Sequence, residues 1–433
     1  MMGAAQRLWR RLTWTWSPAS PREAGEAIVR NLWLHWFPVK VSTRAMSWRY
    51  SLWLGTATAS AFAILVVTGV LLMFFYVPSP ERAYASMKDL GYAVSFGWLL
   101  RNQHRWAAHL MVALSFLRMV RVFLTGAYRG TRALNWLIGL ALLLVTLLLS
   151  FTGYLLPWDQ LALWAVTVGT NIAREAPWAG EWIRFILLGG TEIGANALIR
   201  FYVLHVAVLP ITLLLLFAYH MWRVRKDGGL AAMEPIRAER SPAPKDPVSS
   251  RTYSVFGATR GATVQVLSST TMEEEDTTFS SPDMGRRIAL VFLIVMVVTL
   301  WLSVLADAPL EEHANPAITP NPAKAPWYFL WLQELVSTTT IRFGGLSISG
   351  GLIGGLLVPG VLLLLAALWP FLDHSPASAE GVWFPRSRRT QNAVFLLITL
   401  AIVALIVVGV FFRGPYWRIY GPGTPWPELP KVL

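Results

Sequence analysis

The stretch that decides the fold is RFYVLHVAVLPITLLLLFAYHMW, residues 200–222. It is long and apolar enough to cross a bilayer as one helix, yet it contains His205 and His220. A histidine inside a spanning helix is costly and by default indicates a functional site. They are fifteen residue steps apart, which rise about 22 Å and return to within about 60° of the same helix face. The two imidazoles are therefore predicted to face one neighbouring helix at two depths, as two stacked cofactor sites require.

The composition of the chain is that of a polytopic membrane protein. Of its 433 residues, 55% are hydrophobic, and the mean hydropathy is +0.48. A soluble protein cannot bury that much apolar surface. The net charge of +13 is spread along the chain, which favours the cytoplasmic loops of a membrane protein over nucleic-acid binding. The absence of cysteine excludes disulfides, thiolate iron–sulfur ligation and covalently attached haem in this chain.

Apolar runs predict seven spans, four before a polar stretch and three after it. The predicted spans are 52–76, 102–124, 134–156, 200–222, 288–306, 348–370 and 391–412. The expected parts are an amphipathic cytoplasmic-side segment (1–50), a four-helix domain (51–222), a polar linker (223–286) and a three-helix domain (287–433). Tryptophans and short apolar runs between 157 and 199 indicate interfacial helices. The predicted fold class is an all-α membrane protein, with a transmembrane four-helix bundle followed by three more transmembrane helices.

Basic residues near the span ends predict the orientation. They precede span one, separate spans two and three, follow span four and precede span seven. All four sets fall on one side of the membrane if the N-terminus is cytoplasmic. The chain is therefore predicted to be an integral membrane protein with a cytoplasmic N-terminus.

Span two contributes a partner for the first histidine. It begins RNQHRWAAHL, with His104 close to its outer end. In an up-and-down bundle, spans two and four run in the same direction, so His104 and His205 lie at similar depth. Two imidazoles that bind one iron from opposite sides are typical axial ligands of an electron-transfer haem.

Paired glycines support the same interpretation. Gly55 and Gly69 in span one, and Gly139 and Gly153 in span three, are each fourteen residues apart. A glycine in mid-helix costs about 1 kcal/mol relative to alanine unless something must approach the backbone closely. Simple helix packing through small residues is the alternative explanation. Because the glycine and histidine spacings match, we expect flat macrocycles against spans one and three.

One member of the pattern is missing. The residue fourteen positions after His104, where a partner for His220 is expected, is Arg118. A guanidinium has no acceptor lone pair, so it cannot ligate iron. His109 is no easy substitute, because it lies about 7.5 Å further along the helix than His104 and about 140° round it.

Over residues 25–420 the chain resembles the cytochrome b subunit of cytochrome bc and b/f-type quinol oxidoreductases. The stretches that carry the resemblance are HRWAAHLMVALSFL with VRVFLTGAYRG after it, SFTGYLLPWDQLALWA, RFYVLH and NPAKAPWYFLWLQEL. The histidine spacing in span four is most similar to the b/f-like and related bacterial forms. Those forms have a four-helix haem part and a three-helix part, which are fused in this chain.

The resemblance implies roles for individual residues. It places the outer, low-potential haem b on His104 and His205, and a second haem near His220. The further matches are Arg101 and Arg200 at the outer haem propionates, Arg121 near the inner haem, and Pro157, Trp158, Asp159, Pro326 and Trp327 around the outer quinol pocket. Tyr328 remains available there to orient the quinol ring.

Two departures from the family pattern matter. With Arg118 in place of a histidine, the inner haem is absent, is five-coordinate on His220, or is shifted with Arg118 on a propionate. The family's Pro-Glu-Trp-Tyr motif reads APWY at 325–328, without the carboxylate thought to accept a quinol proton. A proton acceptor must lie within hydrogen-bond reach of the proton, and Glu334 is the candidate; an ion-paired interface charge is its alternative. Together with Tyr328 and Asp159 it makes up the candidate catalytic set.

The resemblance implies a subunit of a quinol:cytochrome c (or similar acceptor) oxidoreductase, which oxidises quinol at the outer face and passes electrons through haem b. The implied partners are a Rieske-type iron–sulfur subunit, a c-type cytochrome subunit, membrane lipids and the quinone pool. The expected setting is a homodimeric, multi-subunit, proton-translocating complex in a bacterial-type plasma membrane. Two alternatives stay open: a haem b anchor subunit that serves a peripheral dehydrogenase, and a non-bifurcating variant without the inner haem.

Overall fold

The computed structural model describes residues 20, 23–26, 40–227, 277–376 and 379–427. Within these residues, seven helices are long and apolar enough to cross a membrane, which confirms the predicted all-α membrane fold. Most of the segment predicted for 1–50, and residues 228–276 of the predicted linker, lie outside the described residues.

The spanning helices are α5 (Leu54–Met73), α7 (Gly97–Leu124), α8 (Ala133–Tyr154), the continuous α11–η3–α12 (Ala195–Val203, Leu204–Val208, Leu209–Lys226), α13 (Asp283–Leu305), η5–α15 (Gly351–Leu357, Val358–Leu372) and α16–η8 (Arg389–Val407, Val408–Phe412). The shorter elements are β1 (Lys40–Ser42), α3 (Thr43–Met46), α4 (Trp48–Ser51), α6 (Ala83–Tyr92), η2 (Gly130–Arg132), α9 (Gln160–Arg174), α10 (Gly180–Leu188), β2 (Thr277–Phe279), α14 (Trp327–Thr338), β3 (Ile341–Phe343), β4 (Leu346–Ile348), η7 (Arg386–Arg388) and η9 (Pro415–Trp417). As predicted, residues 157–199 are largely helical.

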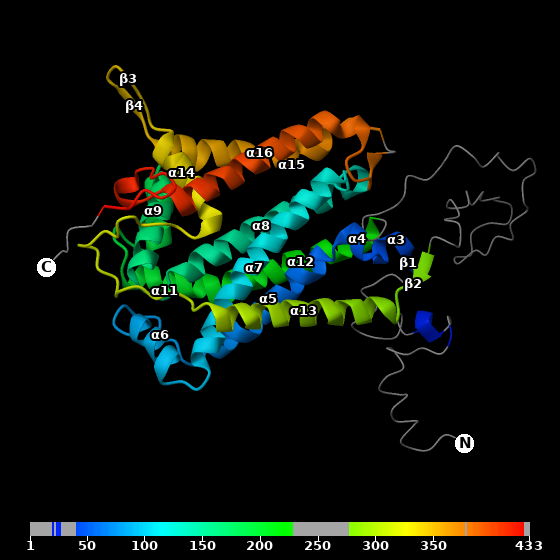
Figure 1. The fold of residues 1–433 in the computed structure, drawn as a ribbon, viewed down its shortest axis with the longest axis horizontal. Coiled ribbons are helices and arrows are strands. Elements are labelled where there is room, and N and C mark those ends of the chain that lie inside the picture. The colour runs from blue at the N-terminus through cyan, green and yellow to red at the C-terminus, as the bar shows by residue number, and fades with distance from the viewer. Residues whose placement is uncertain (1–19, 21–22, 27–39, 228–276, 377–378, 428–433) are drawn as a thin grey trace, which may run out of the picture.

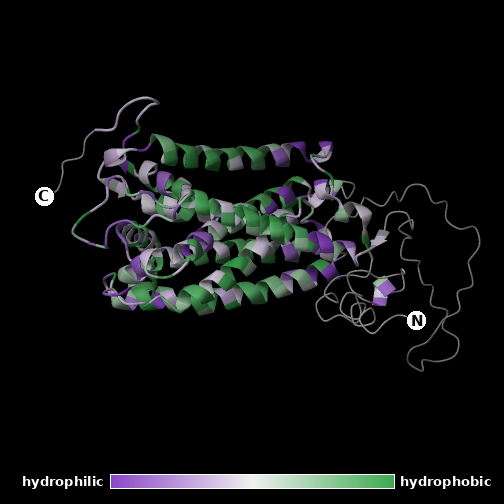
Figure 2. Ribbon diagram, turned by 60° about the horizontal axis from the view of Figure 1, so that its bottom comes forward, coloured by the Kyte–Doolittle hydropathy of each residue, from purple (hydrophilic) through white to green (hydrophobic). Residues whose placement is uncertain are grey.

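The first four spanning helices form a bundle, and α13 lies along α5 and α7 (Figure 1). Buried apolar side chains pack between these helices, including Ala61 on α5, Ala107 and Met111 on α7, and Val291 and Val295 on α13. Figure 2 shows hydrophobic residues along the lengths of the helices and hydrophilic residues gathered towards their ends. In a bilayer, where water does not satisfy the backbone, helices satisfy their own hydrogen bonds.

Several helices extend beyond their apolar runs because polar side chains near the ends find partners. Helix α7 begins at Gly97 rather than at the predicted 102. Asn102 is buried there: its Nδ2 donates to the Ser303 carbonyl (2.9 Å), and its Oδ1 accepts from the Ala308 N–H (2.8 Å). These two hydrogen bonds tie α7 to the end of α13, a connection that hydropathy does not reveal.

Two of the spanning helices widen into π turns just before a proline. One π segment covers Leu204–Val208 and is followed by Pro210, and the other covers Gly351–Leu357 and is followed by Pro359. Proline has no N–H for the carbonyl four residues earlier, and its ring crowds that carbonyl, so the helix adjusts its pitch. His205 therefore projects from a π turn.

The two ends of the molecule carry different short helices and strands. Figure 1 shows α9, α14 and the β3–β4 hairpin at one end, which we call the outer end. The other end, the inner end, carries α3, α4 and the antiparallel β1–β2 pair. At the outer end, the Asp159 carboxylate caps α9 by accepting from the Ala162 N–H (2.8 Å).

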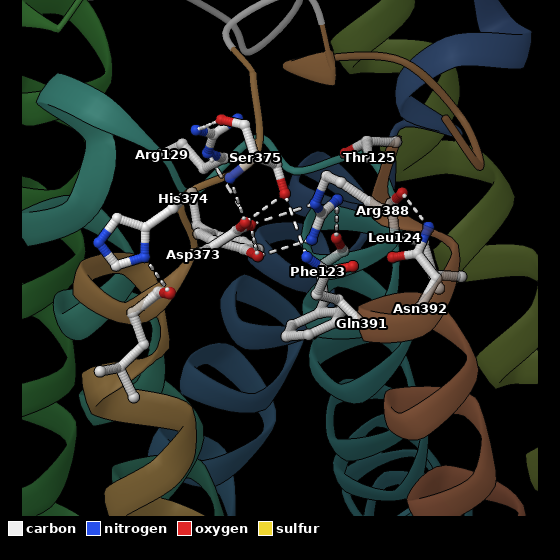
Figure 3. A network of polar contacts seen from close by, with 12 residues as sticks. Phe123, Leu124, Thr125, Arg129, Asp373, His374, Ser375, Arg388, Gln391 and Asn392 are labelled. Carbon is white, nitrogen blue, oxygen red and sulfur yellow. Dashed lines mark hydrogen bonds and ion pairs between the residues drawn. The ribbon is translucent and has the colours of Figure 1, made fainter. Parts of the chain in front are cut away.

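At the inner end, a buried polar network joins the turn after α7 to the loop after α15 (Figure 3). Asp373 accepts hydrogen bonds from the Tyr128 hydroxyl (2.6 Å) and from Arg388 Nε (3.2 Å). Arg388, fully buried, also donates to the Phe123 carbonyl (3.0 Å). Burial acts to raise the pKa of Asp373, but the hydrogen bonds from Ser375 and Tyr128 and the Arg388 charge together hold it below its ordinary value.

Candidate functional site

His104 on α7 and His205 on η3 face each other near the outer end of the bundle. Their ring centres are 6.1 Å apart, and the ring planes are inclined by 73°. Thr68 donates its hydroxyl proton to the Ile64 carbonyl (2.7 Å), so its oxygen accepts from His104 Nδ1 (2.9 Å). His205 Nδ1 donates to the Leu149 carbonyl (3.0 Å). With Nδ1 of both rings donating, Nε2 is the lone-pair nitrogen of each neutral imidazole.

A cavity of about 280 Å³ adjoins this histidine pair. Its wall includes His104, His205, Gly69 and Gly153, together with the polar or pocket residues Arg101, Arg105, His109, Ser150, Tyr154, Pro157, Asp159 and Tyr328. Apolar side chains of α5, α7 and α8 make up much of the rest. The cavity therefore connects the histidine pair with part of the predicted quinol pocket.

The four glycines predicted from their spacing face the four corresponding side chains of α7 and of the His205–His220 helix. A Cβ at Gly153 would lie 2.4 Å from His205 Cε1, and one at Gly69 would lie 3.2 Å from His104 Cε1. Nearer the inner end, a Cβ at Gly55 would lie 2.0 Å from Arg118 Nη1. The fourth contact is ordinary, with 3.9 Å from Gly139 to His220 Cε1. At Gly153 the close approach needs a residue without a side chain, whereas at Gly69 the imidazole, and at Gly55 the end of the Arg118 side chain, would have to shift.

The inner pair differs from the outer pair in its chemistry. Arg118 Nη2 donates to His220 Nε2 over 2.8 Å, so the lone pair of that nitrogen is already engaged. The imidazole of His220 is buried, and the Arg118 guanidinium lies against Gly55. Arg121, the predicted neighbour of the inner haem, lies over the Tyr50 ring with its Cζ 4.4 Å from the ring centre.

The residues predicted for the quinol pocket are partly brought together. Pro157, Asp159 and Tyr328 line the cavity, and the Tyr328 hydroxyl is hydrogen-bonded to Ser150. Trp158 instead packs in the core at the outer end, with a left-handed backbone (φ 52). Burial raises the pKa of Tyr328, which keeps its hydroxyl protonated as a hydrogen-bond donor.

Asp159 is committed to structure. One carboxylate oxygen caps α9, and the other accepts from the Glu311 N–H (3.1 Å). Both oxygens thus hold the backbone around the cavity mouth in place. The carboxylate positions the site, and the hydrogen bonds oppose its use as a free base.

Glu334 does not line the cavity. It is buried in α14, and its carboxylate is bound by Arg413 through Nε (2.9 Å to Oε1) and Nη2 (2.8 Å to Oε2). Both carboxylate oxygens are thus engaged by one guanidinium. The ion-pair alternative describes this geometry, which places Glu334 away from the cavity.

The two arginines predicted at the outer haem propionates differ in position. Arg101 lines the cavity and donates to the carbonyls of Ala308 (2.9 Å) and Pro309 (2.6 Å). Arg200 is exposed, does not line that cavity, and donates to the Ile186 carbonyl. Only Arg101 is therefore placed beside the histidine pair.

His109 is the residue whose position the sequence did not predict. It lines the cavity, accepts a hydrogen bond at Nδ1 from Trp327 Nε1 (3.0 Å), and has its ring centre 5.7 Å from that of Tyr328. The available signal was the second histidine of span two, a residue type that is costly in a spanning helix. Its position on another face of α7 argues against iron ligation, and the sequence pattern indicates no other role for it.

Comparison with known proteins agrees with this architecture. A family model described as cytochrome b/b6/petB matches residues 40–228, and one described as cytochrome b(C-terminal)/b6/petD matches residues 313–421. The cytochrome b6 of Heliobacterium mobile is 43% identical over 175 residues, which are 40% of this chain and 82% of that protein. The cytochrome b6 of Prochlorococcus marinus (strain MIT 9211) is 40% identical over 175 residues, 40% of this chain and 80% of that protein.

The chain belongs to the cytochrome b/b6 family. A solved structure titled "Hyperthermophilic respiratory Complex III" has the same fold, with a TM-score of 0.67, 23% identity, and coverage of 94% of this chain and 89% of that one. Membership makes this protein a bc/b6f-type cytochrome b, an electron-transfer redox subunit that is integral to the membrane. Haem b binding and a quinone site are implied by the family.

The residues at the outer position fit a haem b, and those at the inner position do not fit one held by two imidazoles. At the outer position His104 and His205 face each other with ring centres 6.1 Å apart, and the Nδ1 contacts leave Nε2 of each ring as the nitrogen that could bind iron. At the inner position Arg118 stands where a second histidine would be needed, and it donates to Nε2 of His220, the nitrogen that would bind iron.

Proposed function

We propose that this cytochrome b/b6 family member oxidises quinol at its outer end, as the cytochrome b subunit of a quinol:cytochrome c (or similar acceptor) oxidoreductase. The observation that carries the proposal is the shared cavity. It places Tyr328 and Pro157, which match the family's quinol pocket, against the wall formed by His104 and His205. The match of these residues to the family's quinol-pocket motifs favours this function over a haem b anchor subunit for a peripheral dehydrogenase.

In this proposal the chain's own residues hold both reactants. His104 and His205 would ligate haem b through Nε2, with Thr68 and the Leu149 carbonyl fixing the rings from behind. When bound, the haem would supply a one-electron acceptor. Arg101 would offset propionate charge, and Tyr328 would orient the quinol ring by hydrogen bonding. The apolar wall of the cavity would exclude water from the pair.

We further propose that the chain is the non-bifurcating variant, with a single haem b. The Arg118–His220 hydrogen bond supports this proposal. One ligand is missing because Arg118 replaces a histidine, and the other, His220, has its Nε2 lone pair engaged by Arg118. Transfer of the second electron to quinone at the inner face would then fail, and proton translocation by the full cycle with it. The five-coordinate alternative, with iron bound through His220 Nε2, requires this hydrogen bond to break.

The remaining features of the proposal concern orientation and partners. Arg129, Arg132 and Arg388 lie at the inner end, which we assign to the cytoplasm by the positive-inside rule. The four-helix part would be the haem domain, and α14 would complete the outer pocket. Since the chain has no cysteine, a Rieske-type iron–sulfur centre and a c-type haem would belong to other subunits of a homodimeric complex in a bacterial-type plasma membrane.

The test uses the purified complex and duroquinol as the electron donor. We expect duroquinol to reduce a haem b with axial histidine ligation, and Tyr328→Phe and Pro157→Ala to slow that reduction without loss of haem. An inert complex with duroquinol, and with a menaquinol analogue in its place, would refute quinol oxidation. If the complex takes electrons only through a peripheral dehydrogenase, the anchor alternative holds.

A further inference from the structure

The outer cavity lacks a carboxylate that is free to accept a proton. Among the described residues that line it, Asp159 is the only carboxylic acid, and both of its oxygens accept backbone N–H groups. Glu334 lies outside the lining, in its ion pair with Arg413. Quinol oxidation releases protons, so the pocket needs another acceptor within hydrogen-bond reach.

Few other side chains of the lining can act as that acceptor. Tyrosine hydroxyls and arginines are already protonated near neutral pH. His104 and His205 would have Nε2 on iron and have Nδ1 committed to Thr68 and Leu149. His109 is the remaining described lining residue with a basic nitrogen, and it lies beside Tyr328 on the quinol-pocket side.

We propose that His109 is the base that takes a proton from quinol at this site. The inference rests on the proposed quinol oxidation. It assigns to a residue of α7 the role of the carboxylate that is missing from the APWY motif. The His109 imidazole contacts two residues of that motif: it accepts a hydrogen bond from Trp327 and packs against the ring of Tyr328.

The hydrogen bond from Trp327 defines the starting state. Because the indole N–H donates to Nδ1 (3.0 Å), the neutral imidazole carries its proton on Nε2. A quinol hydroxyl that takes the place of the indole N–H would donate to the same lone pair. The quinol O–H bond then breaks, an Nδ1–H bond forms, and the quinol becomes a monoanion; no electron moves in this step. The imidazolium afterwards releases its Nε2 proton to water, which makes the ring a relay.

The surroundings of His109 suit this exchange. Trp327 is 36% exposed, so its indole has room to turn away from His109. Arg105, one helical turn earlier on α7, also lines the cavity, and its positive charge stabilises a quinol anion. Besides Arg105, His109 and the histidine pair, the ionisable groups of the described lining are Tyr76, Arg101, Tyr154, Asp159, Tyr202 and Tyr328.

The experiment compares His109→Gln with His109→Glu in the full complex, with duroquinol as the donor. Glutamine keeps a polar side chain but cannot take a proton, so we expect kcat to fall by about 100-fold. Glutamate restores a proton acceptor, so we expect kcat to recover to within about ten-fold of the unmodified chain. Haem content and the spectrum after chemical reduction should be unchanged in both variants, which separates the effect from misfolding.

Each outcome decides the matter. Wild-type kcat in His109→Gln would overturn the inference while leaving quinol oxidation intact. Equal loss in both variants with haem intact would also overturn it, because it would indicate a need for the imidazole shape rather than for a base. An unmodified complex that does not oxidise duroquinol or a menaquinol analogue would overturn the proposed function itself. If either variant loses haem, His109→Asn and His109→Asp repeat the same comparison with shorter side chains.

Discussion

At the outer end of the four-helix bundle, two imidazoles face each other with Nδ1 of each donating to a neighbouring helix. At the inner end, the same helices bring together His220 and Arg118, and the guanidinium donates to the imidazole. Glycines are placed in the same way at both ends, because Gly55 and Gly139 lie fourteen residues before Gly69 and Gly153.

The difference shows that the framework of a site and its chemistry can be lost separately. The inner end retains small residues against which a macrocycle could pack. Its two facing side chains, however, are hydrogen-bonded to each other, and this bond engages Nε2 of His220. A nitrogen whose lone pair already accepts a hydrogen bond has less to gain from binding a metal.

The largest expected effect is the loss of the outer haem. In His104→Leu or His205→Leu an axial ligand is removed, and we expect haem b per polypeptide to fall to near zero by the pyridine haemochrome assay. The matched control is His220→Leu, the corresponding change at the inner end, for which we expect no change in haem content or spectrum. Loss of haem in the control as well would show that the inner site holds haem.

The second prediction attempts to make the two ends equal. Arg118→His supplies the missing imidazole opposite His220, between the retained Gly55 and Gly139. We expect haem b per polypeptide to rise from one to two, with a second haem signal in a redox titration. Arg118→Gln is the control, since it removes the guanidinium without supplying a strong ligand. Two haems in the unmodified chain would refute the single-haem proposal.

The sequence predicted the parts of this comparison that depend on regular geometry. Helical periodicity placed His104 opposite His205, and glycine spacing placed Gly69 and Gly153 against them, because both follow from the constant rise and twist of a helix. The family resemblance named Tyr328, which the structure places in the cavity wall.

The structure was needed wherever distant segments meet. Glu334 was a reasonable base by its distance from the APWY motif, but its partner Arg413 lies 79 residues away and cannot be paired with it from periodicity. The contact between His109 and Trp327 joins residues 218 positions apart. Arg200 matches a family arginine by position in the sequence, yet its side chain turns to the Ile186 carbonyl.

The third prediction concerns the glycines, which differ in how closely they approach their partners. In Gly153→Ala the new methyl would lie 2.4 Å from His205 Cε1, so the imidazole must move. We expect partial loss of haem and a shifted midpoint potential. Gly139→Ala is the matched inner change, with 3.9 Å to His220 Cε1, and should have no effect on either measurement. Equal effects from the two substitutions would contradict a close-packed outer site.

The smallest effect on the haem is expected from the inner-end network of Figure 3. Asp373→Asn removes the carboxylate that faces Arg388, whose side chain is fully buried, and breaking such a pair typically costs about 3 kcal/mol. We expect a lower Tm with unchanged haem content and spectrum. The dependence of Tm on pH tests whether the charge of Asp373 is responsible, because its hydrogen bonds and the Arg388 charge hold the pKa of Asp373 below its ordinary value.

A carboxyl group with a depressed folded-state pKa stabilises the fold fully above its unfolded pKa of about 4, and loses that contribution as the pH falls through the folded value. The Tm difference between the unmodified chain and Asp373→Asn should therefore be constant near neutral pH and shrink in acid. A difference that persists at the lowest accessible pH would mean that the residue acts through packing rather than charge. A loss of haem in this variant would mean that the two ends of the bundle are coupled, and that the outer site depends on how the inner end is closed.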